Sequence, residues 1–458
     1  MADLNAFLTE NRARHLDELF DFLRIPSVSA KSDHDAETAR AADWLADRIR
    51  DAGMSAEVLP TDGHPVVIGE WREAGPDAPT LLIYGHYDVQ PAEPLDLWDS
   101  PAFEPTVREG RIYARGSADD KGQLYMHVKA LEALLKVEGR LPVNVVVVAE
   151  GEEEIGSPNL VPFVEKHRDR LAADTVIISD SAMFAPGQPS LLFSLRGLAY
   201  LEVHVSAAKG DLHSGAYGGA VPNPATELAR MISTLHDADG RIMIPGFYDD
   251  VVDWPEETRA AIRTLDFDEE DFRAGVDSPG LHGEAGYSVL EQLWIRPTCE
   301  VNGLLSGWTD EGAKTVLPAK SMAKISFRLV PDQSPKRVAQ IFLAHLKSVA
   351  PDWVRVEVKE LHGGNPWKAD PSGPLFDAAA VALEEAFGKK PVIVGEGGSI
   401  PIVGEFERIL EAPALLVGFA LPGCNMHAPN EWFTIENYEK GIGALCRLYG
   451  ELGSRLSD

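Results

Sequence analysis

The chain of 458 residues contains 72 acidic and 42 basic residues, which gives a formal net charge of −30. This excess of negative charge disfavours binding to nucleic-acid phosphates and to anionic lipids, and we interpret most of it as a solvated surface. Hydrophobic residues make up 45% of the sequence and charged residues 25%, and no apolar run approaches the ~20 residues of a membrane helix. The length predicts two or three domains.

The amino terminus lacks the basic and apolar segments of a secretory signal, so we expect a cytoplasmic protein. The three cysteines, Cys299, Cys424 and Cys446, are too scattered for a disulfide framework and are expected to be free thiols. Cys424 precedes His427 closely, which could suggest a Cys/His zinc site. The sequence has no partner Cys-x-x-Cys motif, so we interpret Cys424 as structural.

Helices and strands alternate in the first part of the chain. Helical spacing of apolar residues predicts helices over residues 4–24, 36–52, 124–135 and 158–171. Short apolar runs predict strands over residues 56–59, 66–71, 81–86, 143–149 and 175–178. Because crossover helices connect the strands, we predict a doubly wound α/β domain.

The pattern changes near Arg196. Alternating apolar residues predict antiparallel strands over 198–207, 324–330 and 354–361, with helices over 223–235 and 334–350, whereas residues 240–300 look irregular. The first pattern returns with helices over 374–387, 400–409 and 435–452 and strands over 391–394 and 414–419. We therefore predict an α/β catalytic domain, residues 1–196 and 372–458, interrupted by a smaller α+β domain, residues 197–371.

Polar residues follow the predicted strands, at the ends where α/β sheets form their sites: His86, Asp88, Asp119, Glu153, Glu154, Asp180 and His427. A lone His-x-Asp pair is more often an ordinary polar contact, and a single acid is more often a solvated loop charge. Several acids at one edge of a sheet would repel one another unless a cation lies between them. Imidazole and carboxylate ligands suit zinc, or manganese where carboxylates dominate, and two such ions would stabilise hydroxide at neutral pH.

Five separated motifs occur in an order known from one superfamily: His86-Tyr87-Asp88-Val89, Ser117 to Gly122, Glu150 to Ser157, Ser179-Asp180 and Gly397 to Pro401. In these motifs the chain resembles the two-metal aminoacylase and carboxypeptidase superfamily of metallopeptidases. It looks most like the dipeptidase branch, which includes carnosine and nonspecific dipeptidases. The likeness covers nearly the whole chain.

The resemblance implies that His86, Glu154, Asp180 and His427 bind two divalent metal ions and that Asp119 bridges the ions. It further implies that Asp88 orients His86 and that Glu153 is the general base that takes a proton from the bridging water. Neighbouring side chains in an extended turn point apart, so Glu154 could face a metal while Glu153 faces the water. We expect zinc, with manganese as the alternative.

In the inserted domain, the resemblance implies that His213 stabilises the oxyanion in the active site of a partner subunit. Thr315 and Arg328 match substrate-binding positions, and Gly398 and Ser399 could offer backbone N–H groups to a substrate carboxylate gripped by Arg328. Two plainer interpretations stay open. His213 could merely cap the following turn, and Arg328 could form an ion pair on an exposed strand face.

We thus predict a cytoplasmic metallo-dipeptidase that hydrolyses dipeptides or similar short peptides through a metal-bridging hydroxide. It would form a homodimer through the lid domain, residues 197–371, and would bind neither nucleic acid nor membranes. One alternative is an N-acyl amino acid deacylase, which would use the same metals and the same contacts to the substrate carboxylate. A second alternative is an inactive metal-dependent binding protein, which the intact Asp88 and Glu153 argue against.

Overall fold

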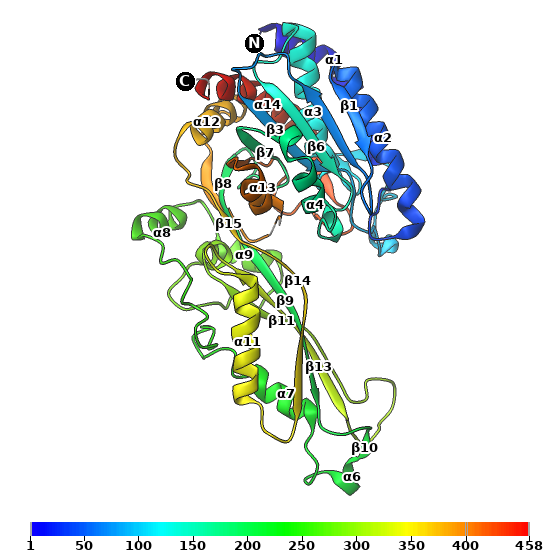
Figure 1. The fold of residues 1–458 in the computed structure, drawn as a ribbon, viewed down its shortest axis with the longest axis vertical. Coiled ribbons are helices and arrows are strands. Elements are labelled where there is room, and N and C mark those ends of the chain that lie inside the picture. Colours follow the sequence, from blue (N-terminus) through cyan, green and yellow to red (C-terminus); the bar gives the residue numbers. More distant parts are fainter. Residues whose placement is uncertain (1, 399, 401, 457–458) are drawn as a thin grey trace. The chain divides into compact units, whose positions relative to one another are not determined.

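The computed structural model describes residues 2–398, 400 and 402–456, and the chain divides into two compact units (Figure 1). The first unit comprises Met1–Phe193, Ala369–Val394 and Ile402–Asp458. The second comprises Ser194–Lys368 and Gly395–Pro401. The assignment of residues 197–371 as a lid and dimerisation domain stays a prediction.

A mixed sheet with the strand order β1-β2-β6-β3-β7-β17-β8 lies at the centre of the first unit. Its strands are β1 (Ser55–Leu59), β2 (Val66–Trp71), β3 (Thr80–His86), β6 (Asn144–Glu150), β7 (Thr175–Ile178), β8 (Ser190–Leu195) and β17 (Ala414–Leu416). β3 runs parallel to β6 and β7, and β17 runs parallel to β7, so these four strands end at the same edge. Every residue of β6 is buried, as expected for a valine-rich strand covered on both faces.

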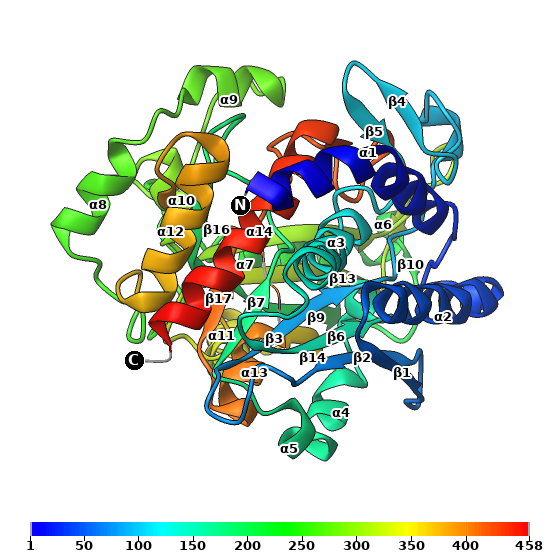
Figure 2. The ribbon, with the colours of Figure 1, turned by 90° about the horizontal axis from the view of Figure 1, so that it is seen from above.

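Helices cover both faces of this sheet (Figure 2). One layer contains α1 (Ala2–Leu23), α2 (Asp35–Ala52), α3 (Lys121–Glu138), α12 (Pro374–Phe387) and α14 (Ile435–Arg455), and the other contains α4 (Leu160–Lys166), α5 (Arg168–Leu171) and α13 (Ile402–Leu410). The single helix predicted over 158–171 is wrong. The backbone of His167 (φ −107°, ψ 17°) leaves the helical region and separates α4 from α5.

A small sheet with the order β18-β5-β4 brings two distant segments of the first unit together. Its strands are β4 (Thr106–Arg108), β5 (Arg111–Tyr113) and β18 (Trp432–Thr434). Trp432 pairs with Tyr113, so the segment that follows His427 lies beside the segment that precedes Asp119. The other short elements are η1 (Ser32–His34), η2 (Leu95–Leu97), η3 (Glu153–Ile155) and β16 (Val392–Glu396).

The second unit contains an antiparallel sheet with the order β11-β13-β9-β14, packed against α7 (Pro224–Ile232) and α11 (Pro335–Val349). Its strands are β9 (Gly197–Ser206), β11 (Thr298–Ser306), β13 (Lys320–Leu329) and β14 (Arg355–Gly364). Also in this unit are β10 (Leu212–His213), β12 (Val316–Leu317), β15 (Trp367–Lys368), α6 (Ser214–Tyr217), α8 (Glu256–Arg263), α9 (Glu269–Gly275) and α10 (Val289–Trp294). Residues 240–300, which look irregular in sequence, therefore contain three short helices.

Cys299, Cys424 and Cys446 are free, as the sequence predicted, and all three are buried. Burial raises the pKa of the Cys424 thiol to about 11 and that of the Cys446 thiol to about 12. Among the described residues, no helix combines the length and the apolar character needed to cross a membrane.

Candidate metal centre

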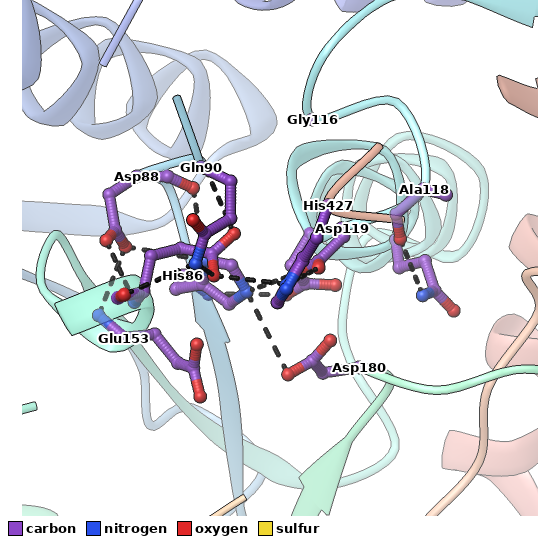
Figure 3. A network of polar contacts seen from close by, with 12 residues as sticks. His86, Asp88, Gln90, Gly116, Ala118, Asp119, Glu153, Asp180 and His427 are labelled. Carbon is purple, nitrogen blue, oxygen red and sulfur yellow. Dashed lines mark hydrogen bonds and ion pairs between the residues drawn. The ribbon is translucent and has the colours of Figure 1, made fainter. Parts of the chain in front are cut away.

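Apart from Asp119, the candidate residues of the first unit follow the ends of its parallel strands. His86 is the last residue of β3, Glu153 and Glu154 begin η3 just after β6, and Asp180 follows β7. His427 lies in the loop between β17 and β18, and Asp119 lies in the loop between β5 and α3. Because parallel strands end at one edge, this order of strands gathers the side chains there (Figure 3).

Within the part of the chain that the structure describes, potential metal ligands form two groups of three. The first group is His86, Asp119 and Asp180, and the second is Asp119, Glu154 and His427, with the ligand atoms of each group within 4.8 Å of one another. His86 Nε2 lies 3.0 Å from Asp119 Oδ1 and 3.8 Å from Asp180 Oδ2. His427 Nε2 lies 2.9 Å from Asp119 Oδ2 and 3.3 Å from Glu154 Oε2.

Asp119 therefore presents one carboxylate oxygen to each group, the arrangement that a carboxylate bridging two ions requires. The donor set consists of two imidazole nitrogens and three carboxylates. Both kinds of donor are ordinary ligands of zinc, and carboxylates also suit manganese. The chemistry of these residues thus fits a pair of divalent cations.

Charges in this cluster are strongly coupled. Burial raises the pKa of Asp180 to about 7, and repulsion from Asp119 adds to the effect. Hydrogen bonds to Asp119 and Glu154 raise the pKa of His427 to about 10. Burial would raise the pKa of Asp119, but hydrogen bonds from His427 and His86 lower it below its ordinary range. The imidazoles thus carry the positive charge that the acids require, and bound cations would take over this role.

Asp88 is fully buried and contacts both His86 and the turn that carries Glu153 and Glu154. His86 Nδ1 lies 3.1 Å from the backbone oxygen of Asp88 and 3.4 Å from its Oδ1. The backbone N–H groups of Glu153 and Glu154 donate to Asp88 Oδ1 and Oδ2 over 3.2 and 3.1 Å. Ser29 Oγ also donates to Oδ2, over 2.6 Å. The Asp88 carboxylate therefore fixes a ligand-bearing turn in addition to facing His86.

The turn of Glu153 and Glu154 differs from the extended conformation that we expected. Both residues lie in η3, a 3-10 helix, because Asp88 holds their two successive N–H groups. Only Glu154 belongs to a ligand group. Burial raises the pKa of Glu153 well above its ordinary range, and repulsion from Asp180 and Glu154 raises it further, although His86 opposes the rise.

Three residues that form hydrogen bonds with the candidate ligands were not identified from the sequence. Gln90 donates to both oxygens of Glu154, from its backbone N (3.1 Å) and its Nε2 (2.8 Å). Asp120 Oδ2 accepts from the backbone N of His86 over 3.2 Å. Glu431 accepts from the backbone N of Asp119 over 3.1 Å. Gln90 directly follows the motif His86 to Val89 and Asp120 lies within the motif Ser117 to Gly122, which is a weak signal, whereas no pattern in the sequence connects Glu431 to Asp119.

The other candidate residues belong to the second unit. His213 is exposed, and its Nδ1 accepts from the backbone N of Gly215 (3.0 Å) and Ala216 (3.2 Å), so it caps α6. The Thr315 backbone oxygen accepts from Ser214 N over 3.1 Å, and His213 pairs with Val316, so Thr315 and His213 are close neighbours.

Arg328 lies elsewhere in the second unit, near the end of β13. The nine residues from Lys320 to Arg328, eight steps along the strand, span roughly 26 Å, so Arg328 and the two-stranded sheet of β10 and β12, which carries His213 next to Thr315, lie at opposite ends of β13. Arg196, which the sequence interpretation missed, donates from Nε to Gly397 O over 3.1 Å, beside Gly398. Burial, with repulsion from Arg328, lowers the pKa of Arg196 to about 10. Ser399 lies outside the described residues.

The chain belongs to peptidase family M20/M25/M40, which matches residues 82–451. It is 32% identical to the Cys-Gly metallodipeptidase DUG1 of Candida albicans, over 97% of this chain and 96% of that protein. It is 30% identical to the human Beta-Ala-His dipeptidase, over 89% of this chain and 82% of that protein. The crystal structure of the M20 family metallo-carboxypeptidase Sso-CP2 from Sulfolobus solfataricus aligns with a TM-score of 0.87 at 34% identity, over 96% and 99% of the two chains.

These comparisons place the chain in the dipeptidase branch of the superfamily, and they confirm the predicted fold class, a mixed α/β fold with an inserted lid domain.

Proposed function

We propose that this chain is a metallo-dipeptidase that cleaves the peptide bond of small dipeptides. The observation that carries the proposal is the pair of ligand groups that share Asp119, one carboxylate oxygen in each group. The relatives add the substrate class, because one is named for Cys-Gly and another for Beta-Ala-His, which are both dipeptides.

Two divalent ions at these groups would supply Lewis acidity, which polarises the peptide carbonyl and makes a water molecule acidic at neutral pH. His86 and Asp180 would hold one ion, Glu154 and His427 would hold the other, and Asp119 would contact both. Zinc is our choice because both groups contain an imidazole, and manganese is the alternative because carboxylates outnumber imidazoles.

Glu153 is the proposed general base, which accepts a proton from the attacking water and passes it to the leaving amine. Asp88 supports this role because it holds the N–H of Glu153 and so fixes the start of the side chain. The same carboxylate faces His86 Nδ1, which leaves His86 Nε2 directed at Asp119. Asp88 would therefore position both the base and a ligand.

Arg328 is the proposed partner of the substrate carboxylate, together with Gly398 and Ser399. Its half-buried guanidinium can form a bidentate contact with a carboxylate, and partial burial strengthens such a contact. The proximity of a second guanidinium, that of Arg196, supports an anion site at this end of β13.

His213 and Thr315 are proposed to serve the active site of a partner subunit in a homodimer. A dipeptide is far shorter than the roughly 26 Å of β13 that separates them from Arg328, so the three residues cannot contact one substrate within a single subunit. The cap on α6 also favours the role of His213. Because Nδ1 accepts from two N–H groups, the neutral ring carries its proton on Nε2, which can donate to an oxyanion.

The edge strand β11 supports an interface in the second unit. Val301, Leu304 and Leu305 on β11, and Trp308 just beyond it, are large apolar residues that are 43% to 60% exposed. An apolar edge strand is a template for pairing with another chain.

The cytoplasm is the proposed compartment, and the three free thiols suit its reducing conditions.

The experiment that tests this function compares four substrates on protein loaded with zinc or manganese: a free dipeptide, its N-acetylated form, a tripeptide and an N-acyl amino acid. We expect rapid cleavage of the free dipeptide, and loss of activity on dialysis against a strong chelator. Preference for the N-acyl amino acid would indicate a deacylase, and preference for the tripeptide would indicate a carboxypeptidase. Full activity after chelation would contradict a metal-dependent reaction.

A further inference from the structure

Glu431 is a fully buried acid whose carboxylate is surrounded by donors from one loop, residues 115–119. Its Oε1 accepts from the backbone N of Ala118 (2.8 Å) and of Asp119 (3.1 Å). Its Oε2 accepts from the backbone N of Gly116 (3.0 Å) and from Arg115 Nη1 (2.7 Å). Four donors thus converge on this carboxylate, and one of them belongs to the residue shared by both ligand groups.

Arg115 extends the contact back to the loop of His427. Its guanidinium is 1% exposed, and Nη2 donates to the backbone oxygen of Ala428 (3.2 Å), which directly follows His427. Glu431 and Arg115 therefore form an ion pair, and each also forms hydrogen bonds with the backbone of the loop that carries the other. We call this pair the Arg115–Glu431 clamp.

The clamp joins two loops that each supply one ligand of the second group. Asp119 comes from the first loop and His427 from the second, and their side chains approach to 2.9 Å. The first loop has a further anchor, because Gln123 Nε2 on α3 donates to Ala118 O over 2.8 Å. The His427 side chain is 57% exposed and so has little packing of its own to hold it. The position of this side chain therefore follows that of its backbone, which the clamp joins to the loop of Asp119.

We propose that Glu431 is a positioning residue that sets the separation of Asp119 and His427, and thereby the affinity for the ion held by Asp119, Glu154 and His427. This inference rests on the proposed two-ion site. The other group should depend less on the clamp, because His86 ends a buried strand and Asp180 comes two residues after the end of another. The signature of Glu431 is thus selective weakening of one of two metal-binding steps.

Glu431→Gln is the direct test. The amide keeps the shape of the side chain but has a single acceptor oxygen, so its NH₂ group must face either Arg115 and Gly116 or Ala118 and Asp119. Metal-free protein is titrated with zinc in competition with a chromophoric chelator. We expect two ions on the unaltered protein, and one step weakened about 10- to 100-fold in the variant, as for other groups that orient metal ligands.

Arg115→Lys provides a second, milder variant in case Glu431→Gln does not fold. A lysine retains one charged bond to Glu431 but loses the bonds that Nη2 donates to the backbone oxygens of Ala428 and Pro91, so the same step should weaken by a smaller factor. Glu132→Gln is the matched control. Glu132 is also buried and ion-paired, with Lys129 at 2.7 Å, but it contacts neither loop in the interactions found, and both zinc steps should stay unchanged.

Wild-type affinities for both steps in Glu431→Gln would overturn the inference, as would equal weakening of both steps. If Glu431→Gln does not fold, unchanged steps in Arg115→Lys overturn it. Binding of fewer than two zinc ions to the unaltered protein would instead reject the two-ion proposal itself. The two failures are therefore distinguishable.

Discussion

Asp88 and Glu431 are two buried carboxylates that each bind the backbone N–H groups of a turn carrying candidate metal ligands. Hydrogen bonds to a charged group contribute about 1.5–3 kcal/mol each, more than bonds between neutral groups. A buried anion that accepts several such bonds therefore stabilises the conformation of the loop around it. The positions of the candidate ligands therefore depend on acids that do not themselves belong to a ligand group.

Glu153→Gln is expected to reduce kcat by about 10² to 10⁴ while two metal ions stay bound, because the amide cannot accept the proton from water. Steady-state kinetics and metal analysis of the same preparation measure both quantities. Glu152→Gln is the control: this neighbouring acid is buried, both its oxygens accept from Asn159 Nδ2, and it lies outside the ligand groups, so kcat should change little. Loss of metal from Glu153→Gln would instead make Glu153 a ligand.

At the scale of single residues, the candidate ligands that the sequence suggested in the first unit are neighbours in the structure. His86, Glu154 and Asp180 each closely follow an apolar run, and parallel strands bring such positions to one edge. Glu431 could not be found in this way. Three of its four donors are backbone N–H groups of a loop more than 300 positions earlier, which leave no side-chain pattern in a sequence, and the fourth, Arg115, is equally distant along the chain.

Helix α3 begins directly after the Asp119 loop, and its second residue, Gly122, lies against that loop. A Cβ atom added at Gly122 would come within 2.0 Å of the backbone oxygen of Ser117. Because a backbone atom cannot turn aside as a side chain can, Gly122→Ala should displace the loop, lower stability by about 1–3 kcal/mol and weaken metal binding. Thermal unfolding and zinc titration measure the two effects.

Gly450→Ala, in α14, is the control for this substitution. Gly450 is exposed and has no atom within 4 Å of the added Cβ, so alanine should raise stability by roughly 0.5–1 kcal/mol through helix propensity. Equal stability of the two variants would show that the approach of Gly122 to Ser117 does not constrain the loop.

Helices α1 and α3 meet through a buried charged cluster that should make stability depend on pH. Burial, with repulsion from Lys129 and Arg14 and in spite of Glu132, lowers the pKa of His15 to about 4 from 6.5. Although burial alone would raise it, the hydrogen bond from Lys129 lowers the pKa of Glu18 to about 2 from 4.5. Both groups bind protons more readily in the unfolded chain, so both destabilise the fold as the pH falls.

The contribution of His15 should be lost as the pH falls from 6.5 to about 4, and that of Glu18 between 4.5 and about 2. The variant His15→Gln lacks the ionisable ring, so its loss of stability between pH 7 and pH 4 should be smaller than that of the wild-type protein by up to about 3 kcal/mol. Thermal unfolding of metal-free protein at several pH values measures this slope. If the stability of the variant and of the wild-type protein changed with pH by the same slope, His15 would not be the source of this pH dependence.

At the scale of elements, the strands and helices with clear periodicity were predicted and the others were not. β9 and β13 alternate buried and half-buried residues, which matches their alternating sequence. β11 was missed because its residues are mostly exposed and follow no alternation, with an irregular register between Val301 and Gly303. α8 and α9 were missed because they are short and bury few side chains: Ile262 is the one buried residue of α8, and α9 has none.

For the molecule as a whole, the proposed dimer predicts that two inactive variants can restore activity to each other. His213→Ala and Glu153→Ala are mixed under conditions that exchange subunits. Each mixed dimer would have one intact site, with Glu153 from one chain and His213 from the other. Random exchange should therefore return roughly a quarter of wild-type activity, as a twofold-symmetric dimer requires. Demonstrated exchange without any return of activity would contradict sharing of the site.

The buried thiols make it possible to detect the unfolding of each unit separately. Alkylating reagents attack thiolates, and burial both shields these cysteines and raises their pKa values. Iodoacetamide should therefore leave the native protein unmodified. Cys299 belongs to the second unit, and Cys424 and Cys446 belong to the first. Brief alkylation at increasing urea concentrations, followed by peptide mass spectrometry, would show which unit loses its structure first, without the introduction of any label.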